Sequence, residues 1–349
     1  MVRLLAFVMC LAAALPARPQ IIDHNDVDRV ASLPQSVMDA IGRQKWFFSH
    51  ALVGTNIVGG INDLRIQSPT RYKLICTSVN YISNQQRAAN PPNPTVAGRI
   101  YECSRGNTGW STKLTVFNNS VRTSGWRYPS VHAAMDKLGY VDQAASAASY
   151  ISSMTALESA YPDTVFVYTT MPLMTSTDSD NVLRNQYNAA VRAHCVANRK
   201  LLFDIADIEA HDPQGVEQTF SYQGQTYQKL YSGYTEDGGL LDLVGRKRVA
   251  MGWYAVAAAI VPVGLSNRAA GDLVMNAGST NWRFAVCGKV TVIDADTFDL
   301  DDGSGIAIRV TAPSHGLATG DTARAAGALD PSATPIALRS CASAVRRLN

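Results

Sequence analysis

The chain has 349 residues, of which 46% are hydrophobic and 17% are charged. This length suggests about two domains, and the apolar content is enough to build a core, which excludes a largely disordered chain. The formal net charge is only +3 and the basic residues are scattered, which argues against nucleic acid as a partner.

The N-terminus has the pattern of a secretory signal peptide over residues 1–20. Met1-Val2-Arg3 gives a positive start, residues 4–15 are apolar, and Pro16-Ala17 follows. The apolar stretch is too short to span a bilayer as a permanent helix. We therefore expect a secreted or periplasmic protein with no membrane span once the signal is removed. A buried N-terminal helix is the alternative interpretation.

Short β-like runs alternate with helical stretches over residues 32–264. Residues 164–169 are dense in β-branched and aromatic side chains, as in a buried strand, and residues 180–199 form a long amphipathic pattern. Further β-like runs are 45–49, 72–79 and 201–205, and a last helix is expected over about 242–260. Strands alternating with helices predict an α/β fold, a three-layer sandwich with a mainly parallel sheet.

Ligands bind such sheets beyond the carboxyl ends of the strands. We therefore expect functional residues just after Phe48, near Asn107, after a strand near Ala145, and in the loop before the last helix.

Composition changes to small and polar residues around 265–282, which predicts a linker. Beyond it, residues 283–349 contain short alternating runs separated by glycine and predict a small antiparallel β domain, similar in rhythm to OB-like barrels. An acidic cluster suggests calcium, but its spacing does not complete a calcium loop with a distal glutamate. Asp302-Gly303 is more simply a hairpin turn. The acidic residues are Asp294, Asp296, Asp299, Asp301 and Asp302.

The chain has six cysteines, and Cys10 lies in the predicted signal. The others are Cys76, Cys103, Cys195, Cys287 and Cys341. Export permits disulfides, and an odd number leaves at least one free thiol. We expect disulfides between Cys76 and Cys103 and between Cys287 and Cys341, only because each pair lies within one predicted domain. There is no C-x-x-C and no His/Cys spacing typical of zinc, so we expect neither a metal site nor a cofactor.

Several phrases between about residues 35 and 264 match one known family in the right order. The first is F-S-H-A-L-V-G-T-N-I at residues 48–57. The others are Gly106-Asn107 with Lys113 and Phe117, and the segments 170–173, 184–188, 202–209, 234–241 and 245–246. Together they resemble the SGNH/GDSL hydrolase superfamily, in the branch whose first strand ends in F-G-H-Q-S-V-G-x-N-I. The resemblance implies an SGNH-hydrolase-like fold for residues 32–264.

The resemblance also implies a serine nucleophile after the first strand, a histidine in the last loop, and an aspartate that orients this histidine. The branch motif places the nucleophile at Leu52, and the commoner G-D-S-L pattern places it at Ala51. Leu240 stands where the family has the histidine, although Asp237 is retained. The serine and histidine of the triad are therefore absent from these positions.

A third block of the family aligns with residues 141–150, where small residues replace larger and charged ones. Three parts of one cleft have thus lost polar function. A ligand-binding cleft is still expected from Ser49, His50, Gly54, Asn56, Gly106, Asn107, Asp237 and Leu240.

Ser49 and His50 are neighbours on a strand, so their side chains point to opposite faces and are not expected to pair. A structural hydrogen bond in the core is the favoured role for His50. Ser49 as a displaced nucleophile would need a base. The candidates are His132, His194 and His211. Asp204, Asp207 and Glu209 follow a strand, and we expect them to cap and solvate the next loop.

Three functional hypotheses follow. The favoured one is a catalytically inactive hydrolase-like protein that binds a glycan or acyl ligand in the old cleft, because Leu52 and Leu240 make its centre apolar. The second is an active carbohydrate esterase or acetyl-esterase that uses Ser49. In the third, the C-terminal β module binds a partner or polysaccharide, which a folded 284–349 fragment binding cell-wall material would support.

Overall fold

The computed structural model describes residues 21–79, 96–122, 131–161, 164–261, 263–264, 267, 283–330, 333, 335–340 and 344–348. The predicted signal peptide, Cys341, and the predicted linker apart from Asn267 lie outside the described residues.

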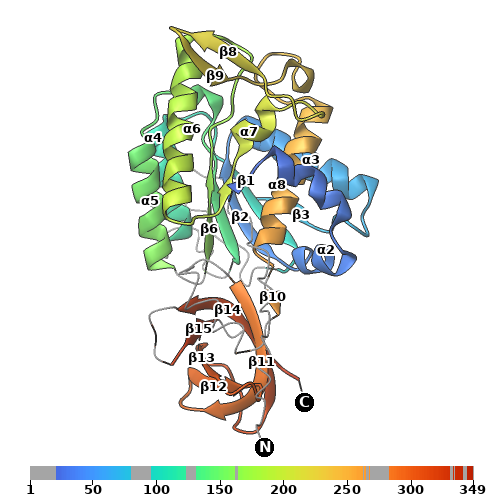
Figure 1. The fold of residues 1–349 in the computed structure, drawn as a ribbon, viewed down its shortest axis with the longest axis vertical. Coiled ribbons are helices and arrows are strands. Elements are labelled where there is room, and N and C mark those ends of the chain that lie inside the picture. The colour runs from blue at the N-terminus through green and yellow to red at the C-terminus, as the bar shows by residue number, and fades with distance from the viewer. Residues whose placement is uncertain are drawn as a thin grey trace, which may run out of the picture.

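Seven parallel strands form the central sheet of the first domain, in the order β1-β7-β6-β5-β2-β4-β3 (Figure 1). The strands are β1 Ile21–Ile22, β2 Lys45–His50, β3 Ile75–Ser78, β4 Arg99–Ser104, β5 Ala133–Asp136, β6 Val165–Thr169 and β7 Leu202–Phe203. The strand order reverses at β2, whose neighbours are β4 and β5. A crevice is expected beyond the carboxyl end of a strand at such a switch point.

Helices cover both faces of this sheet, which confirms the predicted α/β sandwich. One face carries α1 His24–Val27, α2 Gln35–Ile41, α3 Val53–Gln67, α7 Ile205–Ala210 and α8 Leu243–Ala259, and the other carries α4 Trp110–Val121, α5 Ala147–Ala160 and α6 Ser179–Ala197. Strand β2 shows why the sequence reads as a continuous apolar run. Trp46 and Phe48 enter the core on one face, while Phe47 enters the core on the other.

The prediction of a strand near Ala145 is wrong. Residues 140–142 form the short helix η2 Tyr140–Asp142, and the side chain of Ser146 caps α5 by accepting a hydrogen bond from the Ser149 amide. The strand of this part of the sheet is β5, which ends at Asp136. The strand expected near Ala145 is therefore replaced by the loop between β5 and α5, which contains η2.

The suggested disulfide between Cys76 and Cys103 is also wrong. Both cysteines are free. Cys103 belongs to the core on the face of α4, while Cys76 packs against the core on the face of α3. A sheet therefore separates the two sulfur atoms. The second suggested pair includes Cys341 and lies partly outside the described residues.

The second domain is a closed β-barrel with its own core. Its strands are β11 Arg283–Val292, β12 Thr297–Asp301, β13 Ala307–Thr311, β14 Thr322–Asp330 and β15 Ala337–Arg339. The order is β11-β12-β13-β15-β14, and β14 pairs back with β11. The pairing of β13 with β15 is parallel, so the domain is mixed rather than purely antiparallel. Short strands β10 Val263–Gly264 and β16 Val345–Arg347 pair at its margins.

The expected hairpin turn at Asp302-Gly303 lies between β12 and β13. Gly303 has a φ of 79°, and the Asp301 carboxylate accepts a hydrogen bond from the Gly303 amide. Asp299 forms an ion pair with Arg309 on the neighbouring strand. These acidic side chains therefore bind backbone amides and an arginine.

Among the residues that the structure describes, we find no helix with both the length and the apolar content needed to span a membrane.

Candidate functional site

The turn after β2 carries the position where the family resemblance places the nucleophile. Leu52 immediately precedes α3 and has φ 51° and ψ −115°. Residues other than glycine rarely adopt a positive φ, and such strain is concentrated at functional turns. In α/β-hydrolases, a strained strand-to-helix turn exposes the nucleophilic serine. Here the turn carries a half-buried isobutyl group, and the preceding Ala51 is buried.

Gly54 allows α3 to begin directly against the end of β2. A β-carbon at this position would lie 2.3 Å from Cβ of His50. His50 is only 1% exposed, and its Nε2 lies 2.7 Å from Oε2 of Glu102. Burial lowers the pKa of His50, although the hydrogen bond to Glu102 acts in the opposite direction. His50 therefore has the geometry of a core histidine.

Ser49 is completely buried and lies beside Asp136 in the register of β2 and β5. The candidate bases lie elsewhere. His132 precedes β5, and its ring accepts a hydrogen bond from the Lys45 amide at the amino end of β2. His194 lies in the last turn of α6, and His211 stacks on His24. The structure does not bring Ser49 together with any of these three histidines.

The last loop retains Asp237 but gives it a different partner. Its Oδ1 accepts hydrogen bonds from the amides of Gly239 at 2.9 Å and Leu240 at 2.7 Å. These two bonds lower the pKa of the exposed Asp237 carboxyl. The carboxylate thus shapes the turn that presents the half-buried side chain of Leu240.

Three loops meet at the carboxyl end of β2. The Asn56 side chain accepts a hydrogen bond from the Leu241 amide at 3.2 Å. This bond joins α3 to the last loop. A β-carbon at Gly139 would lie 3.4 Å from Cδ1 of Leu52, and one at Gly239 would lie 3.1 Å from the ring of Tyr140. The turn at Leu52, the loop after β5 and the last loop therefore form one site.

Gly106 and Asn107 lie in the loop between β4 and α4. Both residues are exposed, and Gly106 has a φ of 71°. The described contacts do not join them to Leu52 or to the last loop.

A buried charged cluster beneath the turn is missing from the sequence interpretation. Its members are Arg105, Asp136, Lys137 and Glu209, each at most 3% exposed. Arg105 Nη2 lies 2.8 Å from Oδ1 of Asp136 and donates to the carbonyl of Lys137 at 2.9 Å. Lys137 Nζ donates to the carbonyl of Ala51 at 3.3 Å, directly under the strained turn.

Burial shifts the pKa values of three groups in this cluster. It raises the pKa of Asp136 to about 6 and that of Glu209 to about 8, and it lowers that of Lys137 to about 7. Perturbed groups of this kind are common at active sites but also occur in structural ion pairs. Because these side chains are enclosed, they support the turn and have no direct access to a substrate.

The three acidic residues after β7 differ in their roles. Asp204 caps α7, as expected, and forms two hydrogen bonds with the guanidinium of Arg192. Glu209 accepts the amide of Leu173 at 2.7 Å. Asp207 instead faces His24, a contact that local sequence spacing cannot reveal.

No protein-family model matches the chain, and no curated protein matches it. Among solved structures, the chain is similar to a GDSL-like lipase from Bacteroides thetaiotaomicron, with 12% identity and a TM-score of 0.39 over 67% of this chain and 97% of that one. It is also similar to a mutant of an acetyl-xylooligosaccharide esterase from Geobacillus stearothermophilus, with 10% identity and a TM-score of 0.39 over 62% of this chain and 94% of that one.

Proposed function

We propose that the chain is an exported SGNH/GDSL-hydrolase-like protein that does not hydrolyse esters and binds an acylated glycan at the carboxyl end of β2. The conformation of Leu52 carries this proposal. A positive φ at a branched residue costs on the order of 1–3 kcal/mol and persists only where the surrounding structure enforces it. The backbone of a nucleophile turn is kept, while its side chain cannot attack a carbonyl.

The chemistry of the remaining groups agrees with an inactive centre. Leu52 and Leu240 offer neither a hydroxyl nor an imidazole, and the Asp237 carboxylate is used by two backbone amides. Hydrolases without triad members retain only about 10³–10⁴-fold acceleration, from binding and the oxyanion hole. We therefore expect binding without useful turnover.

The character of the site supports an acyl group attached to carbohydrate. Leu52 and Leu240 are half-buried apolar side chains, and the Tyr140 ring lies beside the last loop. Exposed Asp237 provides a polar group outside this apolar centre. Such sites typically combine an apolar lining with a few polar groups that orient the ligand. The signal-like pattern of residues 1–20 supports export.

The closed barrel order supports an OB-like description of the second domain, since OB folds are five-stranded Greek-key barrels that bind oligonucleotides or oligosaccharides. Partner or polysaccharide binding by this module stays a prediction. An active esterase using Ser49 is less favoured, because Ser49 is buried.

Calorimetric titration with an acetylated xylooligosaccharide tests the proposal. We expect the parent chain to bind it without releasing acetate, and Leu52→Asp to weaken binding at least tenfold, because a carboxylate would enter the apolar centre. Leu243→Asp is the matched control, since Leu243 is already 52% exposed. Deacetylated oligosaccharide and free octanoate separate the glycan and acyl contributions. Absence of binding by the parent, or equal binding by Leu52→Asp, contradicts the proposal.

A further inference from the structure

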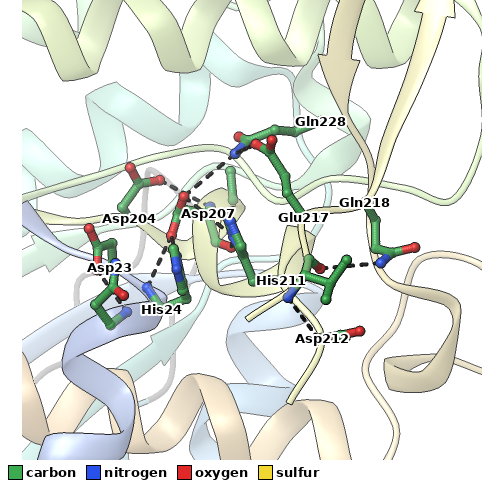
Figure 2. Close-up of polar contacts among 12 residues, drawn as sticks. Asp23, His24, Asp204, Asp207, His211, Asp212, Glu217, Gln218 and Gln228 are labelled. Atoms are coloured by element: carbon green, nitrogen blue, oxygen red, sulfur yellow. Dashed lines mark hydrogen bonds and ion pairs between the residues drawn. The ribbon is translucent and has the colours of Figure 1, made fainter. Parts of the chain in front are cut away.

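A second polar cluster lies beyond the carboxyl ends of β1 and β7, at the opposite margin of the sheet from β3. His24 begins α1 just after β1, while Asp207 and His211 lie one turn apart on α7 and just beyond its end. Because β1 and β7 are parallel neighbours, the elements that follow them meet. Figure 2 shows His24, Asp207 and His211 directed toward one another.

The contacts in this cluster are short and convergent. The Asp207 Oδ1 accepts the His24 amide at 3.0 Å and lies 2.5 Å from Nδ1 of the same histidine. The Asp207 Oδ2 lies 3.5 Å from Nδ1 of His211. One ring nitrogen of each histidine and one oxygen of Asp207 all lie within 4.8 Å of one another.

The cluster is sheltered but reachable. The side chains of His24, Asp207 and His211 are 19%, 16% and 9% exposed. The two imidazole rings stack with centroids 3.5 Å apart and an interplanar angle of 13°. A hydrogen-bonded link between α1 and α7 needs only His24 and Asp207. His211 is held separately, by a 2.7 Å hydrogen bond from its Nδ1 to the backbone carbonyl of Asp207, which directs its Nε2 to the role of a ligand.

The surroundings favour a cation. Gln228 donates to the Glu217 carboxylate at 2.7 Å and approaches Asp207 at 3.5 Å (Figure 2). Arg192 forms two hydrogen bonds with Asp204 and also interacts electrostatically with Asp207 and Glu217. Three carboxylates therefore share one guanidinium, which leaves a local excess of negative charge.

We propose that His24, Asp207 and His211 bind a divalent transition-metal ion, for which Zn²⁺ is the best match. Two imidazole nitrogens and one carboxylate oxygen form an established zinc ligand set that leaves a position for water. Donors bound at about 2.0–2.2 Å in a tetrahedral site lie roughly 3.3–3.6 Å apart. His211 would bind the ion through Nε2, because its Nδ1 donates a hydrogen bond to the backbone carbonyl of Asp207 at 2.7 Å.

Binding requires a small rearrangement at His24. Its 2.5 Å contact with Asp207 is a hydrogen bond and must open by about 1 Å for the ion to enter. The stacked rings must also tilt, because each nitrogen lone pair lies in the plane of its own ring. The bound ion would then connect α1 to α7, segments that the sequence separates by 183 residues. The sequence analysis expected no metal because it found no C-x-x-C and no His/Cys spacing typical of zinc, and His24 lies 183 residues from Asp207.

Titration of the EDTA-treated, dialysed full chain with Zn²⁺ and Co²⁺ tests this proposal. We expect one ion per chain, a Co²⁺ absorption spectrum of low coordination number, and a raised melting temperature with Zn²⁺. His24→Gln and His211→Gln should each weaken Zn²⁺ affinity at least tenfold. His315→Gln, which changes a histidine of the barrel, is the matched control and should bind as the parent does.

His211→Gln keeps the hydrogen bonds between His24 and Asp207, so it separates loss of ligation from loss of folding. Near-ultraviolet circular dichroism of each variant provides the check on folding. The proposal is overturned if folded His24→Gln and His211→Gln bind Zn²⁺ as tightly as the parent. It is equally overturned if Co²⁺ retains the octahedral spectrum of the aqueous ion in the presence of the parent.

Discussion

In the proposed function, Leu52 separates two properties that normally occur together at a nucleophile turn. Its backbone conformation depends on the packing of α3 against β2, which Gly54 permits by leaving room for His50. Its chemistry depends only on the side chain. One substitution can therefore remove the nucleophile while the geometry of the turn remains.

His50 gives a residue-scale prediction about pH. Burial lowers its pKa below the ordinary value of 6.5, so its contribution to stability is complete above pH 6.5 and is lost as pH falls through the folded-state pKa. We expect an NMR titration of the ring to give a midpoint below 6.5. Glu102→Gln should lower this midpoint further, because it removes the opposing carboxylate. A midpoint above 6.5 would mean that the ion pair outweighs burial.

The packing of α3 on α8 gives a prediction at the scale of elements. A β-carbon at Gly60 would lie 2.1 Å from the backbone oxygen of Arg246, whereas one at neighbouring Gly59 would lie 3.6 Å from its side chain. Gly60→Ala should lower the free energy of unfolding by roughly 1–3 kcal/mol through overpacking. Gly59→Ala should raise it by up to about 1 kcal/mol through helix propensity. Urea denaturation measures both, and equal effects would contradict this close helix contact.

Local pattern was sufficient for the elements with strong signals. The apolar run of β2 and the β-branched run of β6 were predicted within one or two residues, and so was α8, which Asp242 caps. Strand β5 was missed because Ala133-Ala134-Met135-Asp136 has no β-branched residue. Strand β1 is only two residues long, too short for a periodic signal.

The candidate site likewise contains residues that local sequence predicts and residues that it does not. Leu52, Asp237 and Leu240 lie in recognisable phrases, so their positions could be predicted. The charged cluster around Lys137 could not, because it depends on where β5 ends and on contacts between the residues that end or follow β2, β4 and β5. The pairing of His24 with Asp207 depends on strands that are neighbours only in the folded sheet.

At the scale of the molecule, the two domains have separate cores. Helix α8 begins after the last loop of the cleft and runs toward the amino ends of the strands, where the chain continues into the barrel (Figure 1). Within the part of the chain that the structure describes, the barrel core contains no residue from the α/β domain. The contacts described around Leu52, which involve Gly139, Asn56 and Leu241, all lie within the first domain.

Labelling with a fluorophosphonate serine-hydrolase probe tests most directly whether this cleft keeps the geometry of a hydrolase without its chemistry. We predict that the parent and Ser49→Ala remain unlabelled, while the double variant Leu52→Ser/Leu240→His becomes labelled. A folded double variant that stays unlabelled would contradict the retained geometry. Labelling of the parent that Ser49→Ala abolishes would show instead an active enzyme with a displaced nucleophile.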